Sequence, residues 1–174
     1  FIIGMRSAAN REDMPGRMGG FTRHAVPFVI FASLTAALLA VLLNSGLSLV
    51  FQQSPAPRLQ YADTVSGPAA LLLVVLLPSV CEELFFREGL LSAFEGHGTL
   101  AAIFVSALSF ALIHGSLENL AGPFAAGLIY GYMTFTLGEV LPAACATFVN
   151  KGLSLLVGYM TRAYAPTGIL PYFL

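Results

Sequence analysis

Charged residues are scarce in this sequence. Asp, Glu, Lys and Arg make up 10% of its 174 residues, whereas soluble globular domains carry about 25%. Hydrophobic residues make up 57%, and the mean hydropathy is +0.81. This number of charges is too small to cover the surface of a soluble domain. We therefore expect an all-α, polytopic membrane helix bundle.

Other absences exclude several classes of function. The only two cysteines, Cys81 and Cys145, lie in apolar segments, so we expect buried free thiols and no disulfide framework. The net charge is -1 and no basic patch is interleaved with aromatic residues, which argues against a nucleic-acid partner. No H-E-x-x-H spacing, nucleophile elbow or pair of broken helices occurs, so we expect neither a metal nor another cofactor, no serine or cysteine nucleophile and no transporter.

Long apolar runs are present instead, and they predict about five transmembrane helices. A membrane-spanning helix needs about 20 consecutive apolar residues, because backbone polar groups cannot be left unpaired in lipid. The predicted spans cover approximately residues 26–51, 68–95, 99–115, 123–137 and 141–160. We expect residues 1–25 to form a cytoplasmic amino-terminal segment and residues 26–174 to form one membrane-embedded domain.

Arginines are concentrated before the first predicted span. Arg6, Arg11, Arg17 and Arg23 place the amino terminus in the cytoplasm by the positive-inside rule. A surface-lying amphipathic stretch is the alternative interpretation of these four residues. The size and the arginine distribution suit a bacterial inner membrane.

The remaining charges cluster where the second predicted span continues beyond its uncharged part, residues 68–80. Each ionisable group at membrane depth costs at least about 2.5 kcal/mol, so a cluster requires pairing or function. Glu83 and Arg87 are four residues apart, with the acid on the amino side, which favours an ion pair. Glu82 projects about 100° around the helix from Glu83 and is left to face His114 or a water molecule.

The spacing around the predicted bend at His97 brings two of these side chains to a similar depth. Glu83 lies 14 residues before His97, and His114 lies 17 residues after it. In antiparallel helices these separations correspond to about 21 and 26 Å. Asn150 lies 11 residues after Glu139 and is also expected within the membrane, either as a contact between helices or as part of a site.

Three other residues are given structural roles. Lys151 is expected to extend its ammonium group towards the membrane surface. Gly127 and Gly131 form a small-xxx-small pair, which usually marks close helix packing.

Two ordered motifs resemble a known family. Glu82-Glu83-x-x-x-Arg87 and Phe110-x-x-x-His114 resemble the first two motifs of the CAAX prenyl endopeptidase and bacteriocin-processing family, also called the CPBP or Abi family. The third helix pair is similar to that family as well, and the resemblance covers about residues 68–160. The matching positions there are Phe124, Gly127, Leu128, Gly131, Leu137-Gly138-Glu139-Val140-Leu141-Pro142 and Asn150.

The resemblance implies a glutamate-dependent intramembrane endopeptidase acting on a peptide or lipidated peptide. By position, Glu82 would activate water as general base, and His114 would help to hold or protonate that water. Glu83 and Arg87 would support the helix and its charges, and Asn150 would help to bind the developing oxyanion. These roles agree with the chemistry of carboxylates and hydrogen-bond donors in a medium of low dielectric.

The last motif departs from the family pattern. A histidine usually stands three or four residues before the asparagine, where this chain has Thr147 and Ala146. Thr147 retains a hydroxyl donor, but losing one oxyanion donor typically lowers the rate about 10²–10³-fold. The alternative reading is a non-enzymatic accessory or scaffold subunit, which would contact membrane lipid and a membrane protein partner.

Overall fold

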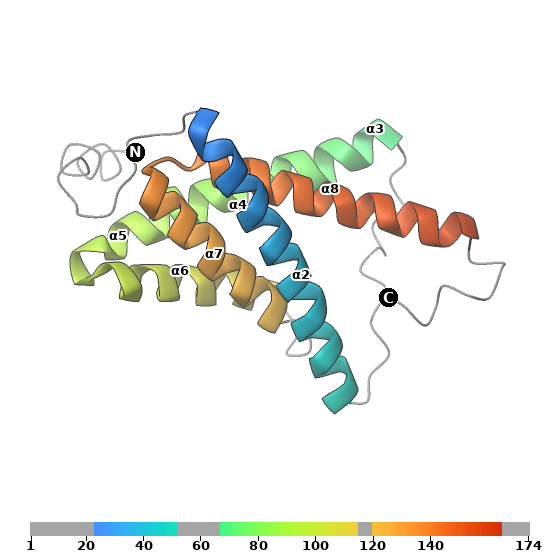
Figure 1. The fold of residues 1–174 in the computed structure, drawn as a ribbon, viewed down its shortest axis with the longest axis horizontal. Coiled ribbons are helices and arrows are strands. Elements are labelled where there is room, and N and C mark those ends of the chain that lie inside the picture. Colours follow the sequence, from blue (N-terminus) through green and yellow to red (C-terminus); the bar gives the residue numbers. More distant parts are fainter. Residues whose placement is uncertain (1–22, 52–66, 115–119, 165–174) are drawn as a thin grey trace.

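The computed structural model describes residues 23–51, 67–114 and 120–164, and these residues form five helical rods without a strand (Figure 1). The all-α prediction is therefore confirmed. The first rod joins η1 (Arg23–Ala25) to α2 (Val26–Phe51). The second joins α3 (Gly67–Ala70), η3 (Leu71–Leu76), α4 (Leu77–Glu83), η4 (Leu84–Leu91), α5 (Ser92–Phe94) and η5 (Glu95–His97). The others are α6 (Thr99–Leu112), α7 (Ala121–Leu137) and α8 (Leu141–Tyr164).

The rods follow the predicted spans closely. Helix α2 has the predicted bounds, whereas α7 begins two residues earlier and α8 continues four residues further than expected. Two helices, Arg23–Leu47 and Gly67–His97, are long and apolar enough to cross a membrane. Thr99–Leu112 and Leu141–Val157 are shorter apolar helices. The predicted cytoplasmic segment lies outside the described residues except for its last three.

Glycine ends two of the rods. Gly98, which follows η5, has a φ of 106°, and Gly138, which follows α7, has a φ of 73°. A side chain with a Cβ is disfavoured at positive φ, so these glycines allow the chain to turn back sharply. The predicted bend after His97 and the predicted break between the last two helices are both confirmed.

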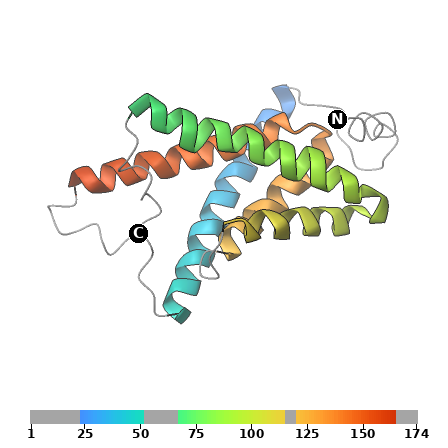
Figure 2. The same ribbon diagram turned by 180° about the vertical axis from the view of Figure 1, so that it is seen from behind.

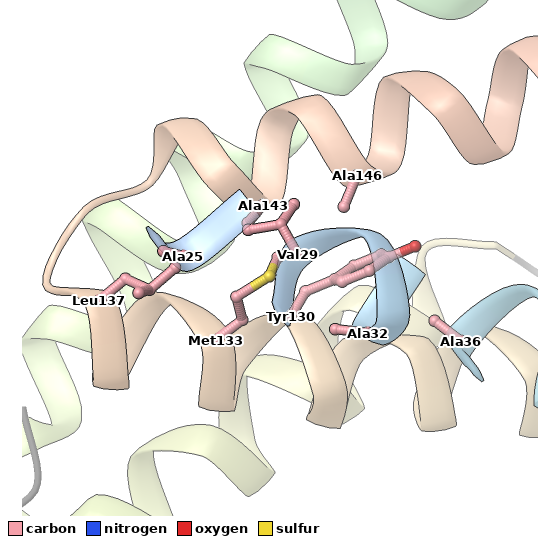
Figure 3. Close-up of a cluster of buried hydrophobic side chains, with 9 residues drawn as sticks. All are labelled: Ala25, Val29, Ala32, Ala36, Tyr130, Met133, Leu137, Ala143 and Ala146. Carbon is pink, nitrogen blue, oxygen red and sulfur yellow. The ribbon is translucent and has the colours of Figure 1, made fainter. Parts of the chain in front are cut away.

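The bundle buries small side chains and presents large apolar ones outward. Along α2, Ile30, Phe31, Leu34, Leu38 and Leu42 are exposed. The residues of the opposite face recur every three or four positions and form one buried cluster with α7 and α8 (Figure 3): Ala25, Val29, Ala32 and Ala36, with Tyr130, Met133 and Leu137, and with Ala143 and Ala146. Small residues let helix backbones approach, and an apolar outer surface is the arrangement that lipid favours.

The glycine pair of α7 packs against α6. A Cβ on Gly127 would lie 2.9 Å from the Cα of Ala107, and a Cβ on Gly131 would lie 3.2 Å from Cγ2 of Ile103. The prediction that these glycines serve close helix packing is thus confirmed. At the amino end of α7, the amide of Gly122 donates a hydrogen bond of 2.9 Å to the side-chain oxygen of Asn44 on α2.

The second rod and α8 lie side by side, as the front and back views both show (Figures 1 and 2). Helix α4 and the π-helical η3 contact α8, while the π-helical η4 contacts α6 and α7. The rod therefore meets α8 along its first half and the α6–α7 pair along its second half. The charged segment lies between these two contacts.

The two cysteines are free, but they are exposed at the surface of α4 and α8. The prediction that they are buried is therefore wrong. Apolar sequence indicates the interior of a soluble protein, but in a membrane bundle the outer surface is apolar too, and a weakly polar thiol is tolerated there.

Candidate functional site: a charge cluster between α4, η4, α7 and α8

A fully buried ion pair lies at the junction of α4 and η4. Glu83 and Arg87 both have 0% exposed side chains, and Nε of Arg87 lies 3.1 Å from Oε2 of Glu83. The other carboxylate oxygen, Oε1, accepts a hydrogen bond of 2.8 Å from the Thr147 hydroxyl of α8. The predicted ion pair is confirmed, and Thr147 stabilises the Glu83 carboxylate because its one hydroxyl proton is donated there.

Aromatic rings surround the guanidinium of Arg87. Its Cζ lies 4.5 Å from the ring centre of Phe110, 5.9 Å from that of Phe86 and 6.0 Å from that of Tyr130. Its nitrogens have no hydrogen-bond partner among the residues that the structure describes. The faces of aromatic rings attract cations, so these rings partly replace the water that the buried guanidinium has lost.

Glu82 has a different partner from its neighbour. Nζ of Lys151 on α8 lies 2.6 Å from Oε1 of Glu82, with side chains 24% and 18% exposed respectively. Oε2 of Glu82 is buried and has no hydrogen-bond partner in the described part of the chain. Lys151 therefore has an ionic partner on the neighbouring helix, and its extension towards the membrane surface stays a prediction.

His114 lies just beyond the carboxyl end of α6 and is exposed. Its Nδ1 is 2.8 Å from the carbonyl oxygen of Phe110, and the centres of the His114 and Phe110 rings are 4.7 Å apart. A carbonyl only accepts hydrogen bonds, so Nδ1 is the donor in this contact, and in a neutral imidazole ring Nε2 is then the acceptor. Phe110 contacts both His114 and Arg87, but Glu82 and His114 have different hydrogen-bond partners, so their direct approach stays a prediction.

Asn150 joins three helices. Its side-chain nitrogen donates to the hydroxyl of Tyr130 on α7 and, at 3.4 Å, to the carbonyl oxygen of Ser33 on α2. Both amide hydrogens therefore have acceptors. The Tyr130 ring lies among the alanines of the buried cluster, with its hydroxyl at the edge (Figure 3).

Sequence reasoning did not find two members of this site, Tyr130 and Lys151. Tyr130 stands between Gly127 and Gly131, and its position within a close-packing motif hid its polar contact. Lys151 is the chain's single lysine and follows Asn150 directly. That scarcity was the signal that could have identified it.

Two carboxylates and two cations thus lie close together inside the bundle. In this arrangement a carboxylate can accept a proton while a neighbouring cation balances its charge. Within the described ranges, no three His, Cys, Asp or Glu side chains come together as a metal site. The chemistry that this site offers is proton transfer by a carboxylate.

Replacing Thr147 with valine is expected to lower the free energy of unfolding by about 1–3 kcal/mol, because a buried carboxylate oxygen loses its donor. Thermal unfolding in detergent micelles measures this loss. Thr147→Ser keeps the hydroxyl and is expected to retain most of the stability. Equal stability of the valine and serine variants would contradict the role given to this hydrogen bond.

The outward-facing apolar side chains and the two ion pairs, one within the second rod and one between this rod and α8, define a class: an all-α membrane helix bundle with a charged interior. The model of the Rce1-like family of Type II CAAX prenyl endopeptidases matches residues 64–153. This match covers 90 of the 174 residues, and the chain belongs to that family.

The match confirms the resemblance seen in the sequence motifs. All six predicted site residues lie within it: Glu82, Glu83, Arg87, His114, Thr147 and Asn150. Tyr130 and Lys151 lie within it as well. At family level the activity is that of a CAAX-type intramembrane protease. The comparisons with curated proteins and with solved structures give no match.

Proposed function

We propose that this protein is an intramembrane endopeptidase in which Glu82 activates a water molecule to cleave a peptide bond near the membrane. The observation that supports this proposal is that the two oxygens of the Glu82 carboxylate have different surroundings. One of its oxygens is held by Lys151, whereas the other is buried without a hydrogen-bond partner in the described part of the chain. Such an oxygen is suited to accept a proton from water.

The proposed reaction needs no covalent intermediate with the protein. Glu82 takes one proton from water as the water oxygen bonds to the carbonyl carbon, and the carbonyl oxygen takes the negative charge. The carbon–nitrogen bond then breaks, and the proton held by Glu82 passes to the leaving amine. One water is consumed, the two peptide products form, and Glu82 returns to its carboxylate state.

The remaining residues are given supporting roles. The acceptor Nε2 of His114 is proposed to help to hold the water, because Nδ1 is committed to the Phe110 carbonyl. Asn150 is proposed to bind the oxyanion. Both of its amide hydrogens have acceptors in this structure, so that role requires substrate to displace either Tyr130 or Ser33.

Substrate and location are part of the proposal. Family membership supports a prenylated or otherwise lipidated peptide as substrate. We place the protein in a bacterial inner membrane with its amino terminus in the cytoplasm, a placement supported by the four arginines before the first span.

The test compares two glutamate-to-glutamine variants, reconstituted in lipid vesicles with a synthetic farnesylated peptide. Glu82→Gln is expected to lower kcat by about 10² or more, because general-base catalysis contributes about 10²–10⁴. Glu139→Gln makes the same chemical change at an exposed position between α7 and α8, and is expected to cleave like the wild type. A folded Glu82→Gln variant with wild-type cleavage would remove the proposed mechanism.

A second candidate function is that of a non-enzymatic accessory subunit. The observation favouring it is that Thr147 and Asn150, the donors of the last motif, are engaged by Glu83 and by Tyr130 and Ser33. Such a subunit would copurify in fixed ratio with a membrane protein partner, and the Glu82→Gln variant would retain that partner and the cellular function. A wild type without cleavage activity but with a stoichiometric partner would favour this reading over the protease.

A further inference from the structure

Lys151 is the only lysine in the chain, and it lies within the last predicted span beside the proposed base. Burying a cation there is costly, so a partner or a function is required. The partner is Glu82, whose Oε1 lies 2.6 Å from the ammonium nitrogen. The reaction steps proposed above use no lysine, so its chemical role is a separate question.

The position of Lys151 on α8 follows from helix periodicity. Thr147 lies four residues earlier, so the two side chains share one face of the helix. Thr147 donates to Glu83 and Lys151 donates to Glu82, so one face of α8 binds one oxygen of each of the two neighbouring carboxylates of the second rod.

Among the residues that the structure describes, Lys151 is the cation in direct contact with Glu82. On its own rod, Glu83 adds a negative charge and Arg87 is paired with Glu83. None of α2, α6 and α7 contains a charged residue. Lys151 on α8 therefore supplies the positive charge that balances Glu82.

We propose that Lys151 is a positioning residue for Glu82: its ammonium group binds Oε1 and orients the carboxylate so that Oε2 is the oxygen that takes the proton from water. This inference rests on the proposed function. A partly buried carboxylate needs a compensating positive charge, and the ammonium of Lys151 supplies it at a contact of 2.6 Å. The ammonium also occupies Oε1, so the two carboxylate oxygens become unequal.

The kinetic test uses the farnesylated peptide in vesicles with three variants. Lys151→Met, which removes the charge, is expected to lower kcat about tenfold or more with KM within about twofold of wild type, because the lysine acts on the base and not on substrate binding. Lys151→Arg keeps a cationic donor and is expected to recover most of kcat. Arg23→Met removes an exposed cation and is the control expected to cleave like the wild type.

A second test does not depend on activity, because the chain has one lysine. An amine-acylating reagent is applied to the protein in detergent micelles, and modification of Lys151 is followed by mass spectrometry. Glu82→Gln is expected to speed modification several-fold relative to the wild type, because the ammonium loses its ionic partner. This comparison requires only that the Glu82→Gln variant is folded.

The outcomes separate this inference from the proposed function. Loss of cleavage in Glu82→Gln, with wild-type kcat in Lys151→Met, would overturn the role of Lys151 and leave the protease intact. A raised KM in both lysine variants would also overturn it, because Lys151 would then be a substrate contact. If Lys151→Met does not fold, Lys151→Gln takes its place with the same expectations. If Lys151 is acylated at the same rate in the wild type and in the Glu82→Gln variant, the ion pair itself would be overturned.

Discussion

Arg87→Met is expected to lower the free energy of unfolding by about 3–5 kcal/mol, because it leaves the fully buried Glu83 carboxylate without its cation. A typical domain is stable by only about 5–15 kcal/mol, so this one change removes a large share of the total. The loss also includes the contacts of the guanidinium with the rings of Phe86, Phe110 and Tyr130. Thermal unfolding in detergent micelles, monitored by loss of helical circular dichroism, measures the change.

The double variant Glu83→Gln/Arg87→Met is the matched control. It removes both charges, so no isolated ion is left in the interior, and the amide oxygen of the introduced glutamine can still accept the hydrogen bond of Thr147. The double variant is expected to be more stable than Arg87→Met alone. If Arg87→Met were as stable as the wild type, or if the second substitution gave no recovery, the ion pair would not contribute as described.

Gly127→Leu is expected to separate α6 from α7 and to destabilise the bundle by about 3 kcal/mol. Overpacking a close contact typically costs about 1–3 kcal/mol, and this contact is at the severe end of that range, since it is with backbone. The first added atom, Cβ, would lie 2.9 Å from the Cα of Ala107, which cannot rotate away as a side chain can. Thermal unfolding in detergent again measures the effect.

Gly46→Leu provides the control on α2. Gly46 is exposed, and a Cβ added there meets nothing within 4 Å. Because glycine weakens a helix interior by roughly 0.5–1 kcal/mol relative to alanine, this variant is expected to be as stable as the wild type or slightly more so. A similar loss in both leucine variants would show that a general effect of leucine, and not close packing of α7 on α6, determines the result.

Much of the fold could be predicted because lipid restricts the possible structures. Uncharged runs must be helices in a bilayer, and glycine and short polar stretches mark where those helices end. The bounds of α2 and the bend at Gly98 were therefore predictable. The exposure of Cys81 was not, because in a membrane bundle both the interior and the outer surface are apolar, so hydropathy alone does not distinguish them.

The site was predictable only where its residues share one helix. Glu83 and Arg87 are related by a fixed spacing of four, and that spacing alone predicts their ion pair. The partners of Glu82 and Asn150 depend on which faces of the second rod, α7 and α8 meet. Periodicity predicts depth along a helix but not rotation about its axis, so Lys151 and Tyr130 escaped prediction.

Composition and the spacing within single segments were enough to predict the helical class, the membrane setting, the turns and the family motifs. The pairing of charges between helices, in contrast, depends on which helix faces meet in the folded bundle. Lys151 is bound to Glu82, and Thr147 to Glu83, because the second rod and α8 lie side by side in one particular rotation. That rotation depends on the packing of several helices at once, and no single segment encodes it.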